Sequence, residues 1–129
     1  MSELTVAMQG LPMFFAKGSV DAGEIKKAEE DLQVSFSQEY IDYVTEYGFI
    51  TWRGHELTGI CQAKRLNVVD VTQEERENNP EISNNLYVIE QTHIGNIVIW
   101  QDEIGTIFRT DYQSQPKKIA ESLREYLKL

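Results

Sequence analysis

Two amphipathic helices are predicted between residues 20 and 48 from the spacing of apolar and polar positions. The first has apolar residues at helical spacing along one face: Ile25, Ala28 and Leu32. The second has an inward stripe of larger side chains: Tyr40, Ile41, Val44 and Tyr47. Asp21 and Ser37 are suitable N-cap residues, and Gly48 is suited to the left-handed conformation that closes a helix. The two helices should therefore begin near residues 22 and 38.

Beyond Gly48 the apolar positions follow a strand-like period. Residues 49–52 and 56–60 flank Arg53, Gly54 and His55, which predicts a hairpin with its turn at Gly54. Three more strands joined by hairpin-length connections are expected: residues 86–90, 96–101 and 106–110. Residues 97–100 are apolar on both faces, so the middle strand of these three should be a central strand.

The remaining segments have weaker patterns. Residues 66–71 fit a short strand or an extended link, and residues 72–75 match a capping box that should start a short helix before Pro80. Pro116 is expected to open a last helix whose buried face is formed by four residues: Ile119, Leu123, Tyr126 and Leu127. Residues 1–18 show no clear period, but three adjacent apolar residues there should dock on the core: Met13, Phe14 and Phe15.

This order of elements predicts an α+β fold, a single domain over residues 1–129 with a mainly antiparallel sheet and helices packed on it. A chain of 129 residues with 41% hydrophobic residues is large enough for one core. No apolar run is long enough to span a bilayer. Cys61 is the single cysteine, and the first four residues lack the basic start of a signal peptide, so we expect a cytoplasmic protein.

Charge is the strongest global feature of the sequence. The chain has 21 acidic and 12 basic residues, which gives a formal net charge of −9. Nucleic acids and phosphate-rich membranes would be repelled, whereas a basic protein partner would be attracted. Acidity also increases solubility in the absence of any partner, so charge alone does not identify one.

No catalytic or metal-binding pattern is present in the sequence. Cys61 with His55 or His93 is the one candidate set for nucleophilic catalysis, but a thiol after an apolar strand is more often a small buried side chain. One cysteine and two separated histidines cannot complete a structural zinc site. The acid pairs have a simpler explanation in helix capping and turn solvation: Asp102 with Glu103, and Glu74 with Glu75 and Glu77. We therefore expect no enzyme activity, no cofactor and no metal.

Several segments in a characteristic order resemble the SUKH superfamily. The first is a helix with Ala28-Glu29 and Leu32, followed by an extended step and a tyrosine-containing helix that ends at Tyr47-Gly48. Later segments resemble the motif after the first hairpin turn and the final hairpins of the family: Leu57-Thr58-Gly59-Ile60, then Leu86 through Gly95-Asn96 and Ile99 to Asp102, Gly105 and Ile107. The resemblance covers about residues 20–127, while residues 1–19 diverge and leave the subfamily open. Ser37 stands where the family usually has proline, and serine caps a helix equally well.

The resemblance implies an α+β fold and a non-enzymatic binding role. Bacterial members of the superfamily are immunity proteins that bind and neutralise secreted polymorphic toxins, many of them nucleases. Fungal members regulate cell-wall synthesis, so a regulatory scaffold or small-ligand-binding module is the alternative. Under the first reading, the partner is a cognate toxin domain with a basic surface, and self-association into a homodimer stays open.

Seven residues are predicted to contact the partner from their chemistry: Glu39, Asp42, Glu46, Trp52, Glu56, Asp102 and Glu103. The first three share the outer face of the second helix, and Trp52 would supply an aromatic anchor. The alternative for the three acids is an ordinary solvated helix face. Whether the seven side chains lie on one side of the molecule depends on the fold.

Overall fold

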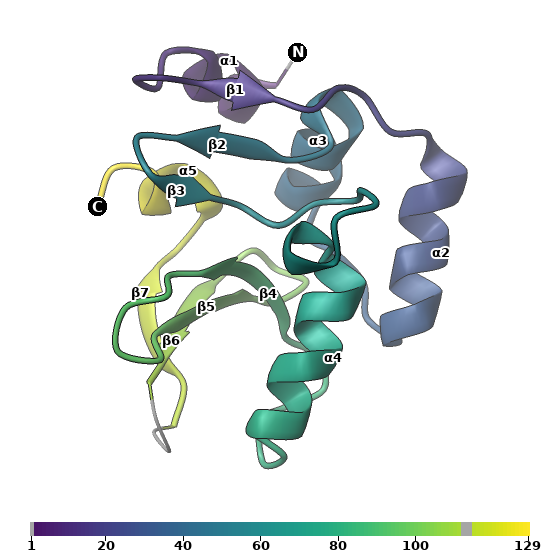
Figure 1. Cartoon of the computed structure of the whole chain (residues 1–129), viewed down its shortest axis with the longest axis vertical. Coiled ribbons are helices and arrows are strands. Elements are labelled where there is room, and N and C mark those ends of the chain that lie inside the picture. Colours follow the sequence, from purple (N-terminus) through teal and green to yellow (C-terminus); the bar gives the residue numbers. More distant parts are fainter. Residues whose placement is uncertain (1, 112–114) are drawn as a thin grey trace.

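The computed structural model describes residues 2–111 and 115–129, in which helices pack around two antiparallel sheets (Figure 1). The helical elements are α1 (Glu3–Gln9), α2 (Ala22–Leu32), α3 (Gln38–Tyr47), the 3-10 turn η1 (Lys64–Leu66), α4 (Val68–Asn78) and α5 (Leu123–Tyr126). The N-terminal sheet has the order β1 (Phe15–Ala16), β2 (Ile50–Trp52), β3 (His55–Glu56). The C-terminal sheet has the order β4 (Tyr87–Gln91), β5 (Val98–Gln101), β6 (Ile107–Thr110), β7 (Lys117–Ala120). The predicted α+β class is confirmed.

Helices α2 and α3 begin and end where the sequence pattern places them. The Asp21 side chain accepts the backbone N–H of Glu24 at 2.8 Å, and the Ser37 hydroxyl accepts that of Tyr40 at 3.1 Å. Both bonds satisfy backbone donors that the first turn of a helix leaves free. The inward face of α3 also includes Tyr43, which is fully buried although the predicted stripe omits it.

The predicted hairpins are confirmed, although the strand expected over residues 56–60 is limited to β3, His55–Glu56. The β2–β3 turn has positive φ at Arg53 (40°) and Gly54 (81°), as expected for a tight turn between antiparallel strands. Strands β4, β5 and β6 pair antiparallel in sequence order. All four residues of β5 are buried, so this strand is the covered central strand that its two-sided apolar pattern indicates.

The prediction for residues 66–75 is wrong. Helix α4 starts at Val68, and the Asn67 side chain caps it by accepting the N–H of Val69 at 2.9 Å. The valines suggested a strand, but the buried residues of α4 recur at helical spacing: Val68, Val71, Thr72 and Glu75. Thr72, expected to be a cap, lies inside the helix, where its hydroxyl accepts the N–H of Val88 in β4 at 3.0 Å. Packing against the sheet outweighs the strand preference of β-branched residues.

The prediction of a helix that begins at Pro116 is also wrong. Residues 117–120 instead form the edge strand β7, paired with β6. Proline is tolerated just before an edge strand because its missing N–H interrupts no ladder bond. The last helix is the short α5, whose first turn is capped by the Ser122 hydroxyl on the N–H of Glu125 at 3.1 Å.

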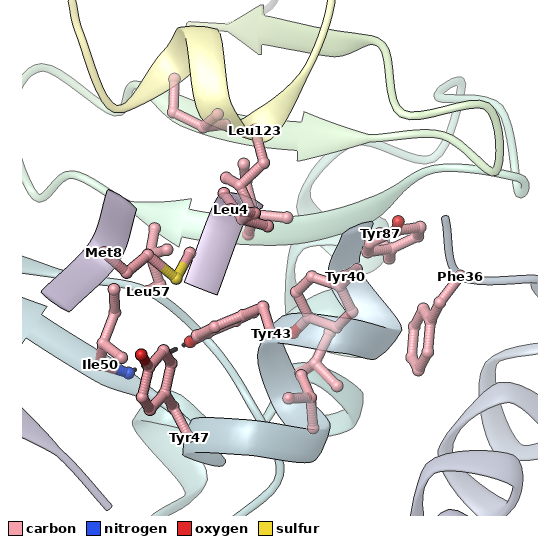
Figure 2. Close-up of a cluster of buried hydrophobic side chains, with 14 of the residues drawn as sticks. Leu4, Met8, Phe36, Tyr40, Tyr43, Tyr47, Ile50, Leu57, Tyr87 and Leu123 are labelled. Carbon is pink, nitrogen blue, oxygen red and sulfur yellow. Dashed lines mark hydrogen bonds between the residues drawn. The ribbon is translucent and has the colours of Figure 1, made fainter. Parts of the chain in front are cut away.

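The N-terminal segment folds onto the core through a helix that the sequence pattern does not predict. Leu4 and Met8 of α1 enter the cluster of buried side chains that also contains Tyr47 and Leu123 (Figure 2). Phe14 packs edge-on against Tyr47 with ring centroids 5.1 Å apart, which confirms the docking expected for it. Its neighbours do not dock, since Met13 is 82% and Phe15 56% exposed.

Buried tyrosines join α3 to both sheets. The Tyr43 hydroxyl donates to the carbonyl of Thr58 at 2.6 Å and accepts the N–H of Ile50 at 3.2 Å, and Figure 2 shows the second of these bonds. The Tyr40 hydroxyl lies 2.8 Å from the Thr58 hydroxyl. Tyr87 of β4 donates to the side-chain carbonyl of Gln101 at 2.9 Å. Burial raises the pKa of Tyr40, Tyr43 and Tyr87.

Candidate functional site

The β5–β6 turn is held in one conformation by a single carboxylate. Oδ1 of Asp102 accepts three backbone N–H groups, from Ile104 at 3.1 Å, Gly105 at 2.9 Å and Thr106 at 2.9 Å. A side chain that satisfies its own turn in this way stabilises the turn without help from the rest of the fold. The turn thereby presents Glu103 and Ile104 to solvent, and Ile104 is 85% exposed.

Glu39 connects three elements beside this turn. Its Oε1 accepts the backbone N–H of Leu123 at 2.7 Å and the side-chain amide of Gln101 at 3.1 Å, and its Oε2 accepts the N–H of Arg124 at 3.2 Å. A β-carbon placed on Gly105 would lie 3.3 Å from the same Oε1. The carboxylate therefore links α3 to β5 and to the start of α5, with the β5–β6 turn against it.

These contacts define an acidic turn surface formed by Asp42, Glu103 and Ile104. Asp42 lies one helical turn after Glu39 on the same face of α3, where it accepts the side-chain amide of Gln38 at 2.9 Å. Glu39 and Asp102 are not counted in this surface. Their oxygen atoms accept backbone N–H groups and so hold the underlying backbone in place. The surface combines the half-buried Asp42 and the exposed Glu103 with the exposed apolar side chain of Ile104.

The other three predicted contact residues lie elsewhere. Glu46 is exposed in the last turn of α3. Trp52 is 7% exposed and stacks on His55 with ring centroids 4.7 Å apart, while Glu56 pairs with Arg65 at 2.6 Å. The structure thus brings together four of the seven residues: Glu39, Asp42, Asp102 and Glu103. Their role in partner binding stays a prediction.

The apolar member of the acidic turn surface was missed in the sequence. Ile104 was assigned to a connecting turn, where apolar side chains usually need no explanation. One feature of the sequence could have indicated it. Ile104 is an isoleucine between Asp102-Glu103 and Gly105 in a hairpin connection, where no apolar face of a strand or helix requires it. Its exposure follows from the turn geometry, which only the structure shows.

The candidate nucleophile and its candidate base do not meet. His55 is engaged by the buried Glu90, with Nδ1 3.0 Å from Oε2, and the Tyr126 hydroxyl donates to the other oxygen of Glu90. Burial raises the pKa of the Cys61 thiol, which reduces the fraction of reactive thiolate near neutral pH. His93 is exposed in the β4–β5 connection. His55 therefore takes part in another contact, and so does Cys61, whose thiol donates to the carbonyl of Ala63 at 3.5 Å.

Residues 2–111 and 115–129 contain neither a metal-binding cluster nor a membrane-spanning helix. Within that part of the chain, no group of three or more His, Cys, Asp or Glu side chains has the geometry to hold a metal ion. None of the helices described there has the length and apolar character needed to cross a membrane.

Fold and surface together define an acidic α+β domain built on two antiparallel sheets. Residues 6–129 match the sequence model of the SUKH family that is described as SMI1-KNR4 cell-wall. Because this match covers nearly the whole chain, the protein belongs to the SUKH (SMI1-KNR4) family, as the resemblance indicated. The matched range begins within α1, so it includes most of the segment that the sequence reasoning set apart as divergent. No curated protein matches the chain.

The structural role of Glu39 is testable by truncation. Glu39→Ala leaves the N–H groups of Leu123 and Arg124 without their acceptor and removes a bond to Gln101. We expect a loss of about 2 kcal/mol in the free energy of unfolding, measured by urea denaturation. Asp42→Ala, which removes only a bond to Gln38 at the surface, should change it by less than about 0.5 kcal/mol. Equal effects of the two substitutions would contradict the linking role of Glu39.

Proposed function

We propose that this protein is an immunity protein that neutralises a bacterial polymorphic toxin by binding it directly, without catalysis. The observation that carries the proposal is the acidic turn surface: Glu103 and the exposed Ile104 belong to a turn that lies against Glu39, and Asp42 follows Glu39 by one turn of α3. It occurs in a member of the SUKH family with a net charge of −9. A surface of this kind suits a partner that is itself basic.

The chemistry of a nuclease toxin explains why acids would be used. A domain that cleaves nucleic acid must hold phosphates, so its active-site surface carries Lys and Arg side chains. Asp42 and Glu103 would pair with these cations and accelerate association, in a manner that falls with ionic strength. Ile104 would supply the apolar contact at the centre of the interface, which charge pairs alone do not provide. Glu39 and Asp102 would contribute by holding the turn in place.

Charge reversal on the acidic turn surface tests the proposal. The double substitution Asp42→Lys with Glu103→Lys places two cations opposite the basic surface of the partner. If the gene lies beside one for a toxin domain, we expect the affinity for that domain to fall by about a hundredfold, measured by isothermal titration calorimetry. Neither residue caps a backbone segment, so the fold should be retained.

A matched variant separates local from global charge effects. Glu30→Lys with Glu77→Lys makes the same change in net charge at exposed positions of α2 and α4. Its affinity should stay within about threefold of the unaltered protein. If both double variants bind equally well, the acidic turn surface is not the interface, and if the unaltered protein does not bind the toxin, the immunity role is wrong.

A regulatory or ligand-binding module is the second candidate. It is favoured by the cell-wall description of the matching family and by a cleft of about 370 Å³ near the end of α4. The lining of this cleft includes Asn79, Pro80, Ile82 and Thr110. A volume of this size lies within the range of small-molecule sites. Deletion of the gene separates the two functions, because altered sensitivity to cell-wall inhibitors with no toxin partner would support the regulatory role.

A further inference from the structure

Strand β1 leaves one side of the N-terminal sheet open. It pairs with β2 alone, and Figure 1 shows it along the upper edge of the molecule. The N–H of Lys17 donates to the carbonyl of Phe49 at 3.1 Å. Because backbone direction alternates along a strand, the N–H and C=O groups of Ala16 point away from β2. An extended chain could therefore add to this edge through backbone hydrogen bonds.

Apolar and aromatic side chains accompany the open edge. Phe15 is 56% exposed and leans against Phe49, with ring centroids 6.3 Å apart. Met13, two residues earlier, is 82% exposed. Phe15 and Met13 thus place exposed apolar side chains beside an unpaired strand edge, and a group of exposed apolar side chains is typical of a contact surface.

The charge of this part of the molecule is opposite to that of the rest. Residues 3–20 and 47–69 contain α1, the N-terminal sheet and η1, and have two acidic residues against four basic ones: Glu3 and Glu56 against Lys17, Arg53, Lys64 and Arg65. Their net charge is +2, and since the whole chain carries −9, the remainder carries −11. The protein is therefore electrically polarised between its N-terminal sheet and the acidic turn surface.

Lys17 lies directly after β1, beside the N-terminal sheet. Its side chain covers Gly48, since a β-carbon placed there would lie 3.1 Å from its Cδ. Lys17 is exposed, whereas Arg65 is paired with Glu56 at 2.6 Å. An acidic segment at the open edge would therefore meet the charge of Lys17.

We propose that the open edge of β1 binds an extended, acidic segment of a partner protein by strand addition. Backbone bonds to Ala16 would fix the segment, Phe15 and Met13 would contact its apolar side chains, and Lys17 would pair with its acids. A second copy of this chain fits poorly, because it would bring two parts of charge +2 together. Nucleic acid fits poorly as well, because it offers no strand backbone and is repelled by the acidic remainder.

A synthetic probe tests the proposal with the full-length protein. The peptide Glu-Val-Glu-Thr-Glu-Val-Glu, blocked at both ends, should shift the amide resonances of Phe15, Ala16 and Lys17 in a heteronuclear NMR titration. Lys17→Glu should weaken its binding about tenfold, and Lys26→Glu, the same exchange on the exposed face of α2, should change it less than about twofold. Ala16→Pro removes the outward N–H without removing a β1–β2 bond, and should abolish binding in a folded protein.

Four results would overturn the proposal. In the first, the acidic peptide leaves the β1 amide resonances unshifted. In the second, the same peptide with lysine in place of glutamate binds with equal affinity. In the third, a deoxythymidine oligonucleotide shifts these resonances more strongly than the peptide does, and in the fourth, they shift with protein concentration alone. The third would assign the surface to nucleic acid and the fourth to self-association. The proposal concerns a different surface from that of toxin binding, so each can fail without the other.

Discussion

Gly59→Ala is expected to leave little folded protein. A β-carbon at this position would lie 1.7 Å from the carbonyl oxygen of Gly48, 2.6 Å from its carbonyl carbon and 2.9 Å from Cβ of Phe49. Two of these atoms are backbone, so no side-chain rotation relieves the overlap. Two hydrogen bonds hold the backbone segments around Gly48 and Gly59 together. The N–H of Ile60 donates to the Gly48 carbonyl at 3.1 Å, and the N–H of Val68 donates to the Gly59 carbonyl at 2.8 Å.

The expected cost exceeds about 4 kcal/mol, a large part of the stability of a typical domain. Soluble yield, far-UV circular dichroism and the urea midpoint measure it. Gly10→Ala is the matched control, because Gly10 has φ −82° and its nearest contact is Ala7 O at 3.5 Å. It should change stability by less than about 0.5 kcal/mol. A Gly59→Ala protein with a native urea midpoint would show that the α3 end and the segment after β3 do not cross as closely as described.

The second large effect that we expect is a steep loss of the free energy of unfolding at alkaline pH. Burial raises the pKa of Tyr40, Tyr43 and Tyr87 above 10.0, the ordinary value for tyrosine, which the unfolded chain retains. Stability is therefore fully present below about pH 10 and falls above it, since only the unfolded chain then releases these protons. Each tyrosine contributes up to about 1.4 kcal/mol per pH unit, so the three together give up to about 4 kcal/mol per unit.

The free energy of unfolding measured in urea at a series of pH values should show this slope, and tyrosinate absorbance should rise together with the loss of circular dichroism. Tyr43→Phe should reduce the slope by up to about 1.4 kcal/mol per pH unit. It should also lower stability at neutral pH by about 2 kcal/mol, because the carbonyl of Thr58 and the N–H of Ile50 lose their partner. Tyrosinate that forms near pH 10 in a protein with unchanged circular dichroism would contradict the burial of these hydroxyls.

Local signals predicted the elements that have strong caps and a clear period. Asp21 and Ser37 start their helices through hydrogen bonds within three residues, so the sequence around each is sufficient. The same reasoning failed at Val68, where β-branched residues suggested a strand although their buried positions follow a helical period. It failed at Pro116 because proline suits both the first turn of a helix and the approach to an edge strand, and pairing with β6 selects the strand.

The candidate site was predicted in its chemistry and only partly in its arrangement. The acids of α3 and of the β5–β6 turn were correctly placed on their elements, and four of the seven residues meet. What the pattern could not reveal is that Glu39 binds the N–H of Leu123, 84 residues away, instead of remaining free for a partner. Trp52 shows the same limitation, since its stacking on His55 inside the hairpin depends on strand register.

The α+β class, the two central helices and the family follow from local patterns, because caps, turns and hydrophobic periods act over a few residues. The motif Leu57-Thr58-Gly59-Ile60 belongs to this part, and its glycine permits the close approach of Gly48. The folded structure was needed to show that Glu39 and Asp102 bind backbone N–H groups while Glu103 is exposed, and that Lys17 lies beside the open edge of β1. These properties depend on distances between residues far apart in the chain, and no local pattern encodes such distances.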